Sequence, residues 1–249
     1  MNGTMRMRAA AAAAFLFAFG AGAAQAQQEV RAQLAARGLP PTLVDGVSAM
    51  AADAAAHGLP TGPIADKALE GWAKRASAER ILAVVQGFTV RMGEARTAVR
   101  SAGVTAPPGD VIAAAAEAMG RGMTGAQVGD VVRAGPAPAD AAPALHVVTA
   151  LAAQGMAMDQ AVTVVATAMR EGRPADQLLD MPSVMRAMQA RGMGPAEVGR
   201  QLMQGGSEGP GGPGMGPGPG GQRPPGAGNR PGGMRPPGEP PPGGGKRPM

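Results

Sequence analysis

The 249-residue chain has no cysteine, no tyrosine, one tryptophan and two histidines. Without cysteine there can be no disulfide, no thiolate metal site and no cysteine nucleophile, so stability must come from packing alone. Aromatic residues make up 2% of the sequence, and three of the four phenylalanines lie within the first 19 residues. The core must therefore be built from alanine, valine, leucine, isoleucine and methionine, which predicts closely spaced helices.

Most of the chain also lacks an excess of either positive or negative charge. The formal net charge is +5, but residues 27–204 contain 16 basic and 16 acidic residues, and residues 205–249 contain five basic and two acidic ones. A nucleic-acid groove needs a concentrated basic face with stacking aromatics. The sequence displays neither feature, so we expect no nucleic-acid partner.

The first 26 residues have the three parts of a secretory signal peptide. Two arginines precede an apolar stretch at 9–19, and Ala24 and Ala26 form a small-x-small cleavage site before Gln27. A retained membrane anchor is the alternative, but the apolar stretch is short of the roughly 20 residues that span a bilayer. No later run is long enough to span either. We expect a periplasmic or secreted protein whose mature chain begins at Gln27.

The other end of the chain changes composition near residue 205. About two-thirds of residues 205–249 are glycine or proline, which predicts a disordered, weakly basic tail. A collagen helix is the alternative, but Met215 breaks the three-residue glycine period set by Gly209 and Gly212. The sequence thus divides into a signal peptide (1–26), a body (27–204) and a tail (205–249).

Within the body a short pattern recurs, in which glycine is followed by an apolar or long side chain and then by proline or a small residue. Glycine suits the left-handed position after a helix, and proline suits the first turn of the next helix. The copies begin at Gly38, Gly58, Gly103, Gly122, Gly155 and Gly192, with a variant at Gly172. This spacing predicts an all-α array of about nine or ten short helices in helix-turn-helix arrangement, with no strands.

Side chains at the predicted helix starts fit the same scheme. Thr124 and Gln127 have the spacing of a capping box. Asp140, Asp176 and Glu197 each follow a proline by two residues, which places a carboxylate in the first turn where the helix dipole favours it.

The most regular segment runs from about residue 78 to 102. Its apolar positions step by four and three residues, as in a heptad seam, at Ile81, Val85, Phe88, Met92, Ala95 and Val99. The seam could join two chains, but three heptads containing glycine and alanine are weak, so we favour packing within the chain. Trp72 and Phe88 are the only large aromatic anchors of the body, and we expect both in the core; a tryptophan exposed for ligand stacking is the alternative.

A segment of about 25 residues carries a family resemblance. Gly58-Leu59-Pro60, residues 66–75 (DKALEGWAKR) and Arg80-Ile81 resemble a pattern of exported, Ala-rich bacterial helical proteins with no known activity. The resemblance implies export and helical character, and it carries no functional residues.

Catalytic patterns are scarce. His57 precedes a predicted helix-ending glycine and His146 lies in an apolar run, so helix capping and a half-buried position account for both. There is no G-x-S-x-G elbow and no phosphate-binding loop. We expect no enzymatic activity, no catalytic residues and no cofactor. A carboxylate-dependent hydrolase is the enzymatic alternative, although no pair of carboxylates is singled out.

Methionine is abundant, with 18 residues in the chain. Met181, Met185 and Met188 share a helical face, and thioethers select Cu(I), so an exported copper-binding protein is an alternative. Unbranched methionine also fills gaps in a core that lacks aromatics, which is the interpretation we favour. The sequence therefore favours a non-enzymatic binding or adaptor protein for a protein or cell-envelope component. Tethering to envelope polymers through the tail remains a further alternative.

Overall fold

A computed structural model describes residues 22–204 of the chain; the predicted n- and h-regions of the signal and the predicted disordered tail lie outside these residues. The described part is all-helical and has no strand, as the sequence predicts. A helix covers residues 22–36. The helices that follow are α2 (Pro41–Ala56), α3 (Gly62–Ala73), α4 (Ala78–Ser101), α5 (Gly109–Gly120), α6 (Gly125–Ala134), the 3₁₀ turn η1 (Pro138–Asp140), α7 (Ala141–Ala153), α8 (Met158–Arg170), α9 (Ala175–Ala190) and α10 (Pro195–Gln204).

The seven predicted helix-ending glycines all adopt the left-handed conformation, which L side chains rarely reach. After α2, for example, Gly58 has φ +68°, and the N–H groups of Gly58 and Leu59 donate to the carbonyls of Ala55 and Ala54 at 2.9 Å. These two bonds close the helix end and turn the chain toward the next helix. The glycines with positive φ are Gly38, Gly58, Gly103, Gly122, Gly155, Gly172 and Gly192.

One turn lacks the glycine. Between α3 and α4 the left-handed position is occupied by Arg75, whose φ is 58°. The same closing bonds form there, since the N–H groups of Arg75 and Ala76 donate to the carbonyls of Trp72 and Gly71. A non-glycine residue in this conformation costs about 1 kcal/mol or more, which the surrounding contacts must offset.

The predicted capping residues are also confirmed. Thr124 and Gln127 form a reciprocal capping box at the start of α6. Asp176 and Glu197 lie in the first turns of α9 and α10. Asp140 differs slightly, because it ends the 3₁₀ turn before α7 and its carboxylate accepts from the Ala137 N–H at 3.1 Å.

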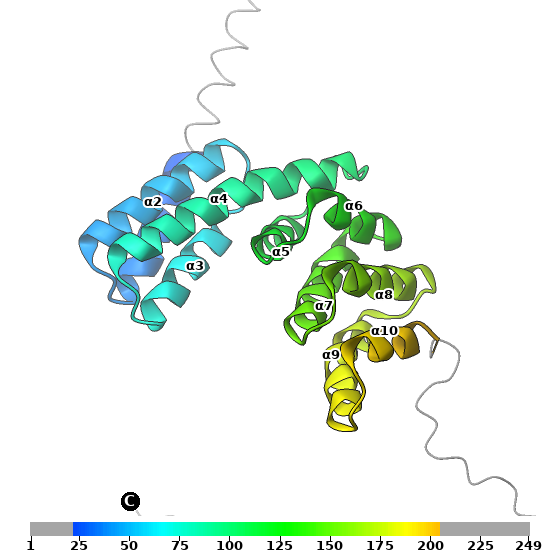
Figure 1. Ribbon diagram of the computed structural model, residues 1–249. Helices are drawn as coiled ribbons and strands as arrows, with labels where there is room; N and C mark the ends of the chain where they lie inside the picture. The colour runs from blue at the N-terminus through cyan, green and yellow to red at the C-terminus, as the bar shows by residue number, and fades with distance from the viewer. Residues whose placement is uncertain (1–21, 205–249) are drawn as a thin grey trace, which may run out of the picture. The chain divides into compact units, whose positions relative to one another are not determined.

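The predicted seam of α4 is entirely buried within the chain. Its six members are 0–2% exposed, and α4 packs against α2, α3, α5 and α6. Figure 1 shows this long helix running from beside α2 and α3 toward α5 and α6. The seam is thus used for packing inside the molecule.

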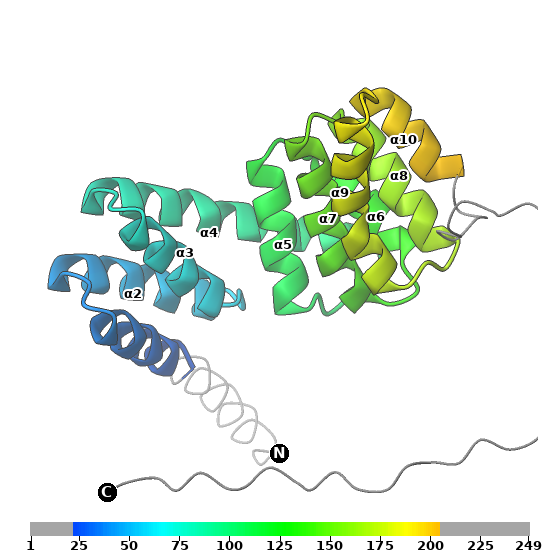
Figure 2. The ribbon, with the colours of Figure 1, turned by 90° about the horizontal axis from the view of Figure 1, so that it is seen from below.

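Beyond α4 the helices form two rows. α5, α7 and α9 contact one another in turn, as do α6, α8 and α10. Figures 1 and 2 both show each helix of one row beside its neighbour in the same row. Each helix pair after α4 therefore packs against the element or pair before it.

The core has the composition that the sequence predicts, but one of the two aromatic residues expected in it lies outside. Phe88 is 2% exposed and lies in the core with alanine, valine, leucine and methionine side chains. Trp72 is 38% exposed, so the prediction that it is a core residue is wrong. It lies in the last turn of α3, whose buried residues Ile64, Ala65 and Ala68 all belong to the earlier turns. None of the helices in residues 22–204 is long and apolar enough to cross a membrane.

Candidate functional site

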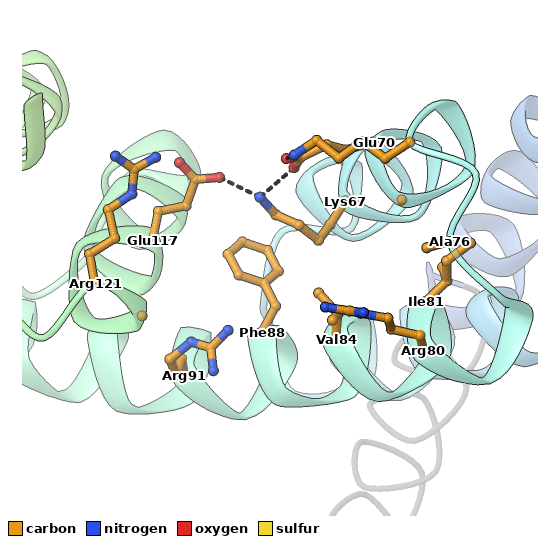
Figure 3. A pocket seen from close by; sticks show the side chains of 13 residues that line it. Lys67, Glu70, Ala76, Arg80, Ile81, Val84, Phe88, Arg91, Glu117 and Arg121 are labelled. Carbon is orange, nitrogen blue, oxygen red and sulfur yellow. Dashed lines mark hydrogen bonds and ion pairs between the residues drawn. The ribbon is translucent and has the colours of Figure 1, made fainter. Parts of the chain in front are cut away.

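A cleft of about 360 Å³ lies between α3, α4 and α5. Figure 3 shows the side chains that surround it. The period of the α-helix explains why the residues of each wall meet. Lys67, Glu70, Gly71 and Lys74 are spaced 3, 1 and 3 residues apart, so they share one face of α3.

The wall formed by α4 combines charge with apolar surface. Arg80, Val84, Phe88 and Arg91 recur every three or four residues along one face of the helix. The Phe88 ring points toward Lys67 and is 2% exposed, whereas Val84 is 46% exposed and forms apolar surface within the cleft. The cleft therefore has an apolar centre on α4 with an arginine on each side (Figure 3).

The wall from α5 comes from its C-terminal end, where Glu117, Gly120 and Arg121 line the cleft. Gly120 allows a close approach, because a Cβ atom there would lie only 3.2 Å from Nε of Arg91. The Arg91 guanidinium thus packs against the backbone of α5. Its Nε is buried and has no hydrogen-bond partner.

A lysine links two of the walls. Nζ of Lys67 on α3 donates to Glu70 at 2.8 Å and to Glu117 on α5 at 2.9 Å, and it lies 5.5 Å from the centre of the Phe88 ring. Nζ of Lys74 also donates to Glu70, at 2.5 Å. These contacts connect α3 and α5 across the face of α4 (Figure 3).

The contacts shift two pKa values. Burial alone would lower the pKa of Lys67, but hydrogen bonds and charge from Glu117 and Glu70 outweigh it, so its pKa is raised. The hydrogen bonds from Lys67 and Lys74 lower the pKa of Glu70 to about 2, despite the opposing effect of burial. At neutral pH Lys67 and Glu70 are therefore both charged.

The cleft concentrates positive charge in a body whose net charge is zero. Five basic and two acidic residues line it, an excess of three positive charges. The acidic residues are paired with lysines, and the guanidinium groups of Arg80, Arg91 and Arg121 form no ion pair within residues 22–204. Charge counts along the sequence do not reveal this local excess, because the residues of the three walls are up to 54 positions apart and the body as a whole is neutral.

The histidines lie apart from this cleft. His57 caps the C-terminus of α2, where its Nδ1 donates to the Asp53 carbonyl at 2.8 Å, and Arg96 of α4 donates to the His57 carbonyl. His146 is exposed on α7 rather than half-buried, which corrects our expectation. Capping and a solvent-facing helix position account for them.

The methionines of α9 belong to the core. Met181 and Met185 are buried, and Met188 is partly buried against the same cluster. Packing accounts for all three, as expected for flexible side chains in a core with few aromatics. Within residues 22–204 there is no cluster of three or more His, Asp or Glu residues that could hold a metal ion.

The predicted signal cleavage site lies in the helix at 22–36. Ala24, Ala26 and Gln27 are not buried, and the first core residue along the described chain is Val30. Cleavage before Gln27 would therefore remove no buried side chain from residues 22–204.

Comparison with protein-family models, with curated proteins and with solved structures finds no match to this chain.

Proposed function

We propose that this protein is an exported, non-enzymatic binding or adaptor protein that holds a protein or cell-envelope component through the cleft between α3, α4 and α5. The observation that carries the proposal is the excess of three positive charges around this cleft, in a body whose total net charge is zero. An anionic group of a ligand would complement that excess.

The three arginines are the basis for binding. None of the three arginines, Arg80, Arg91 and Arg121, has a carboxylate partner among the described residues. The Nε atom of Arg91 is also buried. Guanidinium groups recognise carboxylates and phosphates through paired hydrogen bonds. Clustering such groups without partners opposes folding, so a site of this kind is more readily explained by a ligand than by stability.

The state of the carboxylates supports binding over catalysis. A general acid needs a pKa near the working pH, whereas the pKa of Glu70 is lowered to about 2 by its lysine partners. Glu117 is committed to the same lysine through one carboxylate oxygen. The only carboxylates lining the cleft thus serve to fix Lys67 in place.

The test is capture from an envelope extract by immobilised full chain, purified after export. The comparison is a variant with Arg80, Arg91 and Arg121 all changed to glutamine, and the control is Arg100→Gln, an exposed arginine of α4 outside the cleft. We expect material that wild type and control retain and the triple variant loses. Material retained equally by all three would refute a binding role for the cleft, and loss on deleting residues 205–249 instead would move the function to the tail.

Export is tested on the same preparation. The intact mass of the protein from the envelope or medium should correspond to a chain that starts at Gln27. A mass that retains residues 1–26 would contradict the cleavable signal.

A further inference from the structure

We infer that the cleft binds an extended acidic peptide segment of about five residues, with a carboxylate near each end and an apolar side chain between them. This inference rests on the proposed function and names the class of ligand. Its basis is the order of charged and apolar groups along α4.

The spacing of the arginines favours an elongated ligand. Arg80 and Arg91 are eleven residues apart on one helix, which separates their backbones by roughly 16 Å at 1.5 Å per residue. A ligand that contacts both arginines runs along the part of α4 between them, which favours an elongated ligand over a single small anion. An extended peptide rises about 3.3 Å per residue, so about five residues cover the same length.

The surface between the arginines favours an apolar side chain at the centre of the ligand. Val84 is 46% exposed there, whereas Ile81 and Phe88, which also line the cleft, are each 2% exposed. Covering Val84 removes apolar area from water, which adds affinity that a purely ionic ligand lacks. A hydrophilic polyanion would leave this surface wet.

Charge also argues against two segments of this chain as ligands of the cleft. The Gly/Pro tail carries five basic residues and two acidic ones, and the signal segment carries two arginines and no acidic residue. Both would be repelled by a cleft with an excess of three positive charges. An acidic partner supplied from another protein is therefore the complementary choice.

The fixed lysine adds to selectivity. Lys67 is 21% exposed and is held by Glu70 and Glu117, so its charge is already neutralised within the cleft. These two carboxylates would repel a densely charged polyanion that filled the whole cleft. They allow a peptide whose acidic groups are confined to its ends, near the unpaired arginines.

The test uses fluorescence anisotropy of a labelled, end-blocked peptide, Glu-Ser-Leu-Ser-Glu, added to the full chain at low salt. Two matched peptides replace both glutamates with glutamine or the leucine with serine. We expect measurable binding of the first peptide and at least a fewfold loss with either replacement. Arg80→Gln and Arg91→Gln should each weaken binding about tenfold, because a charge-assisted hydrogen bond is removed. Arg100→Gln should leave it unchanged.

Circular dichroism of each variant shows whether the fold is kept. If Arg91→Gln fails to fold, Arg80→Gln and Arg121→Gln carry the test, because both side chains extend from exposed residues. Equal binding of the acidic and glutamine peptides, or binding of inorganic polyphosphate in preference to the acidic peptide, would overturn the inference. Failure of the peptides together with cleft-dependent capture from the extract would overturn the ligand class and leave the proposed function standing.

Discussion

The close approach of α3 to α4 gives the sharpest test of the cleft geometry, through the substitution Gly71→Ala. A methyl group on Gly71 would lie 2.8 Å from Cγ1 of Ile81 and 3.5 Å from two further atoms of that side chain. Ile81 is 2% exposed and belongs to the buried seam of α4, so it has little room to move. Overpacking of this kind costs about 1–3 kcal/mol.

Gly93→Ala provides the matched control. Gly93 lies inside α4, and a methyl group there would meet no atom within 4 Å. Replacing an unconstrained helical glycine by alanine stabilises by about 0.5–1 kcal/mol. The same gain, or less near the helix end, applies to Gly71, so the overpacking should leave Gly71→Ala about 1–3 kcal/mol less stable than Gly93→Ala.

Urea unfolding followed by circular dichroism measures both variants. Trp72 fluorescence provides a second probe, since the single tryptophan of the chain is adjacent to Gly71. Two probes are needed because a helical array can unfold in more than one step. If both alanines stabilise the protein equally, Ile81 does not contact Gly71 in solution and the placement of the α3 wall is wrong.

Three further predictions concern single side chains. Phe88→Ala should lower the free energy of unfolding by on the order of 3–5 kcal/mol because the ring is buried, and Trp72→Ala should lower it clearly less. Equal losses in urea unfolding would contradict the different burial of the two side chains. Thr124→Ala should cost about 1 kcal/mol by removing a helix cap, while Thr61→Ala, at a helix start without a side-chain cap bond, should change stability by a few tenths at most. Lysine contacts lower the pKa of Glu70 to about 2, so its ionic contribution to stability is present above pH 4.5 and is lost as the pH falls toward 2. The difference in unfolding free energy between wild type and Glu70→Gln should therefore shrink over that range. A constant difference would argue against the lysine contacts.

Local signals made most of the fold predictable. Helix ends depend on a few adjacent residues, so the glycine turns and the capping box at Thr124 could be read directly from the sequence. The heptad spacing of α4 likewise predicted which face would be buried. Periodicity does not show how far neighbouring helices extend along that face, which is why the burial of Trp72 was mispredicted.

The cleft could not be predicted in the same way. Each wall shows only a charged helical face, which is ordinary for an exposed helix. The local excess of positive charge arises when α3, α4 and α5 pack together, and it depends on Lys67 reaching Glu117, 50 residues away. Single-sequence patterns carry no information on such pairings.

The position of α4 has a consequence for how this protein can vary in length. Since α4 contacts helices on both sides of it, an inserted residue near Gly87 would rotate everything after it by about 100°. Arg91 would rotate away from the α3 side of the cleft, and the two halves of the seam would no longer lie on one face of α4. Related chains should therefore gain or lose residues in the glycine turns and keep the length of α4 constant.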